Sequence, residues 1–384
     1  MGLSGAYTGA CRGLDAVDWN PANLALDASG GFSLGIASVS VDLSNNAFSL
    51  ARYNEISGAV LTEADKREIL SEIPGEGFIL DANARASALG LRAGPLALTF
   101  QGIAGGTGTL DRDFFDLILL GNEIGQSFSF EDTDGEAYAV GAATLSFGTP
   151  VITRRAFRLS AGVNARYLHG IYDITVEEAD GGITADMDGV RGEASAAMLT
   201  SQGGRGYAVD AGLALQLPRG WTLGLAVSNV SSRLTWDREV ERRVWSARGD
   251  SITATTDDID AHITESDTTY AAPAYARSLP AVVRLGACNA FGPFLVACDV
   301  SRGIEKRAGV SDKLAVDVGV EWRLLSWLQP RCGVGFGGEV RRAAAGLGLN
   351  LGAVRWDLAA ANRGQFVPGD SKGLALASGL ALDF

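Results

Sequence analysis

The chain has 384 residues, 50 glycines and a net charge of −13 at pH 7, and 47% of its residues are hydrophobic. This acidic balance argues against a nucleic-acid partner, because phosphate contacts need clustered Lys and Arg side chains. No run of about 18 apolar residues occurs, which excludes a transmembrane helix. Mean hydropathy is nevertheless slightly positive, at +0.12. The apolar residues are therefore spread along the chain, as in strands with alternating faces.

The sequence offers no catalytic or cofactor motif. Its four cysteines have no Cys-x-x-Cys spacing, and with only His169 and His262 a zinc site is not expected. The Gly-x-Ser-x-Gly elbow, the His-Glu-x-x-His helix and the phosphate loop are missing. The run Asp257-Asp258-Ile259-Asp260 lacks the glycine and terminal glutamate of a calcium loop, so we expect a solvated acidic loop there. We predict no enzyme activity, no metal and no cofactor.

Residues 1–30 form the irregular part of the chain. Gly, Asn and Pro interrupt any periodicity, and the stretch DWNPAN at 18–23 has the composition of a turn with a buried aromatic residue. The first residues, MGLSGAYTG, have neither the basic region nor the apolar core of a secretion signal, so none is expected within the chain. A flexible terminus is the simplest interpretation of residues 1–30.

The stretch GAYTGACRGLDAVDWNPANLA at 5–25 resembles the N-terminal signature of the outer-membrane long-chain fatty-acid transporter (FadL-like) family and its relatives, including the shuttle barrels of type IX secretion. The resemblance implies a small hatch lodged in the periplasmic side of a fourteen-stranded barrel. Trp19, Asn20, Pro21 and Ala22 would then form the hatch and gate, with Asn-Pro-Ala as the central turn and Trp19 as a wedge. The close match covers about twenty residues; the rest of the chain matches only in pattern.

Segments with strict period-two alternation follow, which is the pattern of strands whose faces meet different media. They lie at 157–167, 209–216, 221–227, 316–324, 347–352 and 354–359. The alternation alone also fits a soluble sandwich. Three features favour a transmembrane β-barrel: the number of these segments, the uniformly aliphatic side chains on one face of them, and the tryptophans near their ends. The tryptophans expected at the membrane interfaces are Trp221, Trp236, Trp322, Trp327 and Trp356.

The polar parity of these strands is expected to face the lumen. Gly, Ala and Ser dominate it, which leaves space inside a barrel of a dozen or more strands. Charges of both signs share this face, which predicts an ion-paired, wet wall, with a dedicated anion site as the alternative. The predicted lumen charges are Arg158, Arg166, Asp210, Arg284, Asp317, Glu321, Arg323, Arg355 and Asp357. Cys288 and Cys298 fall on opposite parities, which disfavours a disulfide between them.

Four longer excursions interrupt the strands, at about 54–81, 105–135, 173–205 and 237–278. The first contains a short helix that begins after Thr62 and ends at Pro74. The second contains an almost wholly apolar helix, DRDFFDLILLG, which has to be buried or to contact something apolar. The last two are acidic loops or long strands that protrude beyond the membrane, since threonine favours extended structure.

The apolar helix has two interpretations of equal weight. The resemblance implies a landing groove for an apolar ligand in an extracellular loop, and a packing element or plug is the alternative. In the first case the groove residues would be Phe114, Phe115, Leu117 and Ile118.

The closing stretch, KGLALASGLALDF, alternates large apolar residues with small or polar ones and ends on Phe384. Such a strand suits the closure of a transmembrane barrel, and Phe384 is a candidate recognition signal for barrel insertion, as in related outer-membrane proteins. The predicted fold is therefore an all-β, antiparallel transmembrane barrel of about fourteen strands at 31–384, with a hatch at 1–30 and short helices in loops. Membrane lipid would surround it.

Two functions remain open. The resemblance implies a barrel in the outer membrane of a Gram-negative-type bacterium that transports or binds hydrophobic, fatty-acid-like molecules in a hatch-gated lumen. The alternative is a non-enzymatic secretion or assembly barrel that binds another protein through its loops or periplasmic face. Kinks at mid-strand glycines such as Gly212 or Gly319 would favour the first. A large apolar patch on an extramembrane loop would favour the second.

Overall fold

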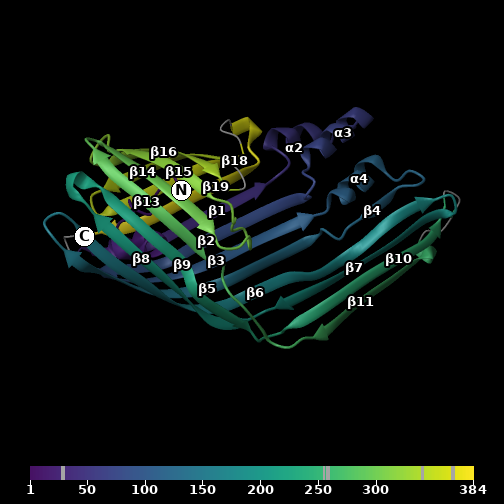
Figure 1. Ribbon diagram of the computed structural model, residues 1–384, viewed down its shortest axis with the longest axis horizontal. Coiled ribbons are helices and arrows are strands. Elements are labelled where there is room, and N and C mark those ends of the chain that lie inside the picture. The colour runs from purple at the N-terminus through teal and green to yellow at the C-terminus, as the bar shows by residue number, and fades with distance from the viewer. Residues whose placement is uncertain (27–30, 254–255, 257–259, 339–340, 365–367) are drawn as a thin grey trace.

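Fourteen antiparallel strands form one closed barrel (Figure 1). The structure, a computed structural model, describes residues 1–26, 31–253, 256, 260–338, 341–364 and 368–384. The acidic run at 257–259 and the last four residues of the predicted hatch, 27–30, lie outside the described residues. The barrel strands are β1 (Phe32–Asn45), β2 (Phe78–Ala93), β3 (Leu96–Leu110), β5 (Asp134–Thr153), β6 (Arg158–Asp186), β8 (Gly204–Gln216), β9 (Thr222–Trp236), β13 (Val282–Phe291), β14 (Phe294–Gly303), β15 (Ala315–Trp322), β16 (Leu328–Gly337), β17 (Arg341–Leu351), β18 (Val354–Gly364) and β19 (Gly373–Asp383).

The first and last strands close the ring. β1 pairs with β19 from Ser33 opposite Asp383 to Ser44 opposite Gly373, so the backbone groups along this seam are paired without an open edge. Short turns join the strands at the end where the C-terminus lies, which we call the turn end, and long connections leave the opposite, loop end (Figure 1). In outer-membrane barrels short turns face the periplasm and long loops face outward. The predicted fold class is confirmed.

The two faces of the strands carry the expected side chains. In β15, Asp317 and Glu321 are buried inside while Val318 and Trp322 are exposed outside. A bulge between Gly35 and Ala37 shifts the parity of β1, so the outward residues beyond it are Val39, Val41 and Leu43. Cys288 is buried and Cys298 exposed, which confirms their opposite faces.

Four of the five predicted interface tryptophans lie on the outer surface near the turn end. Trp221, Trp322, Trp327 and Trp356 are 41% to 46% exposed, as in an aromatic girdle. The fifth was wrong, because Trp236 is only 1% exposed and packs against Val140, Leu168, Leu234 and Leu279. Trp236 shares the buried parity of β9 with Leu234, so its ring lies among barrel residues and does not reach the outer surface.

The helices gather at the loop end. They are α2 (Leu50–Ile56), α3 (Glu63–Glu72) and α4 (Arg112–Leu120). Thr62 and Asp65 form a capping box at the start of α3, and Asp111 caps α4, so both predicted helices are confirmed. No sequence pattern predicted α2, which has only seven residues and is capped by Ser49. In the described part of the chain, no helix has the length and apolarity needed to cross a membrane.

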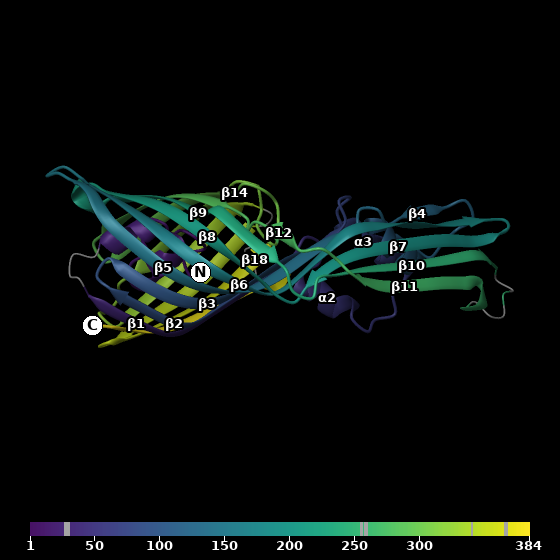
Figure 2. The same ribbon diagram turned by 90° about the horizontal axis from the view of Figure 1, so that it is seen from below.

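A second sheet continues the barrel wall beyond the loop end (Figure 2). We call it the extension sheet: β4 (Ser127–Ser129), the second half of β6, β7 (Gly189–Ser201), β10 (Glu241–Ile252) and β11 (Ile263–Ala271), paired in that order. Of the two interpretations of the last two excursions, protruding strands is the correct one. A short β12 (Tyr275–Arg277) pairs with β9 and leads back to β13. Single turns of 3-10 helix lie at η3 (Pro218–Gly220), η4 (Asp260–His262) and η5 (Pro368–Asp370).

Candidate functional site

The N-terminal segment lies inside the barrel rather than outside it (Figure 1). Residues 1–26, which we call the hatch, form η1 (Gly13–Asp15), α1 (Ala16–Trp19) and η2 (Pro21–Ala25). Asn20 caps η2, because its Oδ1 accepts the N–H of Ala22 at 3.1 Å, while its Nδ2 donates to the carbonyl of Leu213 in the wall at 3.0 Å. Thus the Asn-Pro-Ala turn is buried against the wall.

Glycines in the wall make room for the hatch backbone. A Cβ added at Gly162 would lie 2.2 Å from the Ala22 nitrogen, one at Gly212 would lie 2.1 Å from Asn20 Oδ1, and one at Gly319 would lie 2.6 Å from Leu3 Cβ. The described ladders show no register shift at Gly212 or Gly319. Close approach of the hatch therefore accounts for these two glycines, and a lateral kink at either stays a prediction.

Carboxylates of the wall and of the hatch hold the two together. Asp299 Oδ2 accepts the backbone N–H groups of Tyr7 at 3.1 Å and of Thr8 at 2.8 Å. Asp317 accepts the hydroxyl of Ser4 at 3.2 Å and pairs with Arg342 at 2.8 Å. These directional hydrogen bonds add to small apolar clusters between hatch and wall, such as Ala6 and Ala10 with Cys288 and Ala297.

The hatch also supplies charge of its own to this contact. Asp15 pairs with Arg355 of β18 at 3.0 Å and accepts the hydroxyl of Tyr7 at 3.0 Å. Burial alone would raise the pKa of Asp15, but the Arg355 guanidinium and the hydrogen bonds outweigh it and hold that pKa below its ordinary value. Asp15 is therefore a charged anchor at neutral pH.

Trp19 lines the lumen cavity and packs against the cluster that includes Leu24 of η2, and its role as a wedge stays a prediction. Its ring contacts that of Tyr7 edge-on, with centroids 5.7 Å apart. The guanidinium of Arg284 lies 5.5 Å from its centroid on the other side, within cation–π range. Of the carboxylates that the structure describes, none pairs with Arg284, whose hydrogen bond goes to the hydroxyl of Ser228 at 2.8 Å.

A cavity of about 600 Å³ lies above the hatch. Tyr7, Leu14 and Trp19 of the hatch form its floor. The side formed by β18 and β19 carries a patch of small apolar side chains flanked by Arg355, Asp357 and Arg363, and other parts of the wall carry further arginines and amides. The apolar patch includes Ala359, Ala361, Ala375 and Ala377, and the polar part of the wall includes Arg85, Gln101, Arg166, Ser228, Asn229 and Arg284. The cavity is thus amphipathic.

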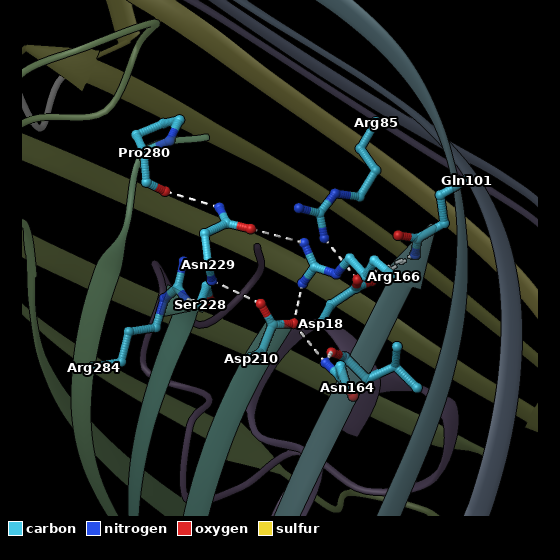
Figure 3. A network of polar contacts seen from close by, with 11 residues as sticks. Asp18, Arg85, Gln101, Asn164, Arg166, Asp210, Ser228, Asn229, Pro280 and Arg284 are labelled. Carbon is cyan, nitrogen blue, oxygen red and sulfur yellow. Dashed lines mark hydrogen bonds and ion pairs between the residues drawn. The ribbon is translucent and has the colours of Figure 1, made fainter. Parts of the chain in front are cut away.

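A polar network crosses the polar part of the wall (Figure 3). Asp210 pairs with Arg166, accepts Asn164 Nδ2 at 2.7 Å and accepts the backbone N–H of Asn229 at 2.8 Å. Asn229 lies in a bulge of β9 with φ 53° and donates from Nδ2 to the carbonyl of Pro280 at 2.8 Å. The network therefore fixes β6, β8 and β9 to the segment that precedes β13.

Asn164 Nδ2 also donates to the carbonyl of Val17 at 2.8 Å, which ties the network to the hatch, and a separate group of contacts holds the hatch nearby. Asp18 pairs with Arg85 of β2 at 2.7 Å and accepts Gln101 Nε2 at 3.1 Å. Sequence reasoning missed Asp18 and Asn229, because neither belongs to a regular alternation: one lies in the hatch and the other in a bulge. The only signal for Asp18 in the sequence was its position as a charged residue within the stretch 5–25, which resembles the transporter family.

The predicted lumen charges form separate groups rather than one site. Arg166 and Asp210 belong to the network, and Asp317 pairs with Arg342. Near the turn end, Arg331 joins Glu321 and Asp357, Arg355 contacts Asp357 at 3.4 Å, and Arg323 reaches Glu321 at 3.4 Å from a half-exposed position. Arg158 donates to the carbonyl of Ala25 in the hatch at 2.7 Å.

The four predicted groove residues of α4 do not share one face. Phe115 packs with Leu119 against the cluster of Leu70 and Ile73 beneath the helix. Phe114 and Ile118 point outward and are 41% and 63% exposed, and Leu117 is half-buried. One side of α4 is thus a packing element, and a ligand groove on its other side stays a prediction.

Two remaining predictions concern the chain end and metals. Phe384 is 70% exposed, with its ring centroid 6.0 Å from that of Phe32, and its role in insertion stays a prediction. Among the described residues, no group of three or more His, Cys, Asp or Glu side chains is placed to hold a metal ion. Burial raises the pKa of the Cys11 thiol in the hatch, which makes it a poor nucleophile.

Three solved structures that are similar to the chain are distant from it in sequence. The toluene transporter TbuX of Ralstonia pickettii is 14% identical, with 99% of this chain and 96% of that chain covered and a TM-score of 0.49. The toluene transporter TodX of Pseudomonas putida is 12% identical, with 100% and 96% covered and a TM-score of 0.49. A FadL homologue of Pseudomonas aeruginosa is 12% identical, with 98% and 94% covered and a TM-score of 0.48.

These structures fall in the group of barrels that the N-terminal sequence resembles. At such identities and TM-scores they say nothing about a ligand of this chain. No curated protein matches it. A family model matches residues 21–354, from the Asn-Pro-Ala turn to the start of β18. The chain therefore belongs to the family described as "Family of unknown function (DUF5723)".

Proposed function

We propose that this chain is an outer-membrane barrel of a Gram-negative-type bacterium that binds and passes hydrophobic, fatty-acid-like molecules through its lumen, with the hatch as the gate. The observation that carries the proposal is the cavity of about 600 Å³ whose floor is the hatch. Small-molecule sites commonly enclose about 300–1,000 Å³. A ligand in this cavity touches the segment that would have to move for it to leave.

The chemistry of the cavity favours a ligand with an apolar body and an acidic head. The alanine patch on β18 and β19 offers an apolar surface, and Arg284 of β13 has donors that no described carboxylate occupies. A carboxylate placed there would form a charge-assisted hydrogen bond in surroundings poor in water. Arg284 also lies over Trp19, so the same contact would reach the hatch.

The way the hatch is held is compatible with gating. Its contacts to Asp299, Asp317 and Arg355 are hydrogen bonds and ion pairs that water can replace, each with a net contribution of about 0.5–3 kcal/mol. These contacts can be exchanged one at a time, and the apolar contacts between hatch and wall are divided among three small clusters rather than one continuous interface. We infer that ligand binding beside Trp19 loosens the hatch.

Two tryptophan variants of β19 test the proposal. Ala377 lines the cavity, while its neighbour Leu376 points outward and is 52% exposed. Ala377→Trp should fill the cavity and weaken binding of dodecanoate by at least about tenfold, the effect of losing one or two good contacts. Leu376→Trp should leave dodecanoate affinity unchanged. Equal affinities of the two variants, measured by calorimetry in detergent, would refute binding in this cavity.

The alternative, a barrel that binds another protein, is supported by exposed apolar side chains on the loop between β3 and β5. Ile118 and Ile124 are 63% and 71% exposed, which is a surface that soluble loops rarely present. If this function holds, the double variant Ile118→Asp, Ile124→Asp should lose a protein that co-purifies with the wild type. Its dodecanoate binding should then equal that of the wild type.

A further inference from the structure

One loop at the loop end folds into the mouth of the barrel. Residues 304–314, between β14 and β15, contain Ala308, which is only 2% exposed, and Val310, which lines the cavity above the hatch. Loops almost always run over the surface, because their backbone polar groups need water or other partners. A buried loop tip therefore has to find its partners inside the barrel.

The tip is a tight hairpin. The Arg307 N–H donates to the carbonyl of Val310 at 3.0 Å, and the Val310 N–H donates back at 2.8 Å. Ala308 and Gly309 between them have φ of 45° and 76°, as in a type I′ turn. Alanine rarely adopts a positive φ. The contacts at the tip have to hold Ala308 in this conformation.

Those contacts lie on the opposite wall. The Ala308 N–H donates to Glu136 Oε1 at 2.8 Å, and Arg307 Nε donates to Glu136 Oε2 at 3.1 Å. Asn83 Nδ2 donates to the Gly309 carbonyl at 3.4 Å, and a Cβ added at Gly105 would lie 2.9 Å from the Ala308 oxygen.

These partners define the path of the loop. Asn83, Gly105 and Glu136 belong to β2, β3 and β5, which lie nearly half-way round the ring from β14 and β15. The loop therefore crosses the mouth from wall to wall.

Glu136 collects further contacts at this point. Arg277, which precedes β13, lies 3.6 Å from Glu136 and 3.5 Å from Asp173. Arg307 also donates to the carbonyl of Ser278 at 3.0 Å. One carboxylate thus joins three segments: the loop tip, the strand that carries Glu136 and the chain returning from the extension sheet.

We propose that residues 304–314 are a lid over the outer mouth of the lumen and that Glu136 is the latch that holds it shut. The lid and the hatch then enclose the cavity from its two ends. What the lid admits rests on the proposed function, but the closure itself does not. A molecule arriving from outside enters when the contacts of Glu136 to Arg307 and Ala308 are broken.

Thiol labelling measures the closure directly. In a Cys298→Ser, Cys332→Ser background, which removes the exposed cysteines, single variants Ala308→Cys and Lys306→Cys are reacted with a membrane-impermeant maleimide in proteoliposomes. Residue 306 is on the exposed part of the loop. If the lid is closed, the cysteine at 308 should react at least about tenfold more slowly than that at 306, because reaction needs an opening event.

The latch is tested in the same assay. Glu136→Gln keeps the side-chain size but removes the charge that pairs with Arg307, and it should raise the labelling rate at 308 by about tenfold. Glu305→Gln is the matched control, because Glu305 also lies 3.8 Å from Arg307 but belongs to the loop itself. It should leave the rate unchanged. Heat-modifiable electrophoretic mobility confirms that each variant is folded.

Each outcome decides one part of the proposal. Equal rates at 306 and 308 in the otherwise unchanged barrel would overturn the lid. A rate in Glu136→Gln no higher than in Glu305→Gln would overturn the latch. Labelling requires no ligand, so a failure of dodecanoate binding would refute the proposed function while leaving the lid in place.

Discussion

The barrel and the extension sheet are both built from antiparallel ladders, yet their side chains lie in different surroundings. In the barrel one face meets lipid and the other meets the hatch, and the ladder closes on itself through β1 and β19. In the extension sheet the edge strand β11 is exposed at every position. Period-two alternation arises only where the two faces differ, so it marks the barrel and fades in the extension.

Charge separates the two regions in the same way. Residues 175–201, 241–252 and 263–271 contain ten acidic residues and four arginines, a net −6 of the chain's −13. The arginines there form exposed pairs, such as Arg242 with Glu177 and Arg248 with Glu193. In the barrel, charges such as Asp299 and Asp317 are buried against the hatch. We therefore expect the barrel to depend on its hatch and to tolerate loss of the extension.

Removal of the hatch should have the largest effect. Deleting residues 1–26 takes away the floor of the lumen cavity and should convert a barrel with little or no conductance into one with discrete single-channel currents in a planar bilayer. Combining the deletion with Glu136→Gln should increase the open time, because the lid then closes less tightly. Currents equal to those of the wild type would show that the hatch does not block the lumen.

The control removes the extension sheet instead. Joining residue 176 to 198 and residue 241 to 271 through Asn-Gly turns uses positions that already face each other in the ladders. The shortened chain should fold and should show the conductance of the wild type. A leaky barrel would mean that the extension supports the wall, which would break the comparison between the two regions.

The second-largest effect is expected from a substitution at Gly162, where the hatch backbone lies against the wall. In Gly162→Val the new Cβ would meet backbone atoms of Pro21 and Ala22, which cannot move aside as a side chain can. The hatch should be displaced from the wall, with a loss of about 1–3 kcal/mol in the free energy of its packing there. It should then become sensitive to added protease. Gly102→Val is the matched control, because Gly102 points outward with nothing within 4 Å. If the hatch is protected from protease in both variants, the wall at Gly162 accommodates the valine side chain without displacing the hatch.

Sequence patterns predicted the elements whose environment is uniform along their length. The alternation at 316–324 and in the closing strand gave the correct faces, and the caps at Thr62 and Asp111 located two helices. The resemblance at 5–25 located the hatch turn. In each case the local signal and the final surroundings agree.

The features that escaped prediction depend on contacts between distant segments. The sequence pattern placed Trp236 at the membrane interface, but its ring packs against Val140, Leu168 and Leu279 of the barrel interior. Asn229 occupies a bulge that no alternation can reveal, and the lid tip at Ala308 is ordered by Glu136, far away in the sequence. Gly212 and Gly319 were interpreted as possible kinks, because the sequence does not show which segment packs against a glycine.

The third effect separates the two sides of α4. Phe115→Ala removes a ring that packs between α4 and the cluster of Leu70 and Ile73, and it should destabilise the helices at the loop end by about 2–3 kcal/mol. Phe114→Ala removes a ring that is 41% exposed and has edge-on contacts with Phe115 and Phe130, and it should change their stability by less than about 1 kcal/mol. Hydrogen exchange of the α3 and α4 amides measures both. A larger effect at Phe114 would indicate that its face is covered.

The smallest effect should come from an ion pair in the extension sheet. Arg243 and Asp267 pair across β10 and β11 but are 52% and 39% exposed, whereas Arg342 and Asp317 pair in the lumen with side chains 20% and 3% exposed. Double-mutant cycles with alanine should give a coupling of about 2 kcal/mol for the lumen pair. For the exposed pair, the cycles should give no measurable coupling, whether at low salt or in 1 M salt. A coupling in the extension as strong as that in the lumen would mean that water does not surround the extension sheet, and that its acidic surface is covered in the state measured.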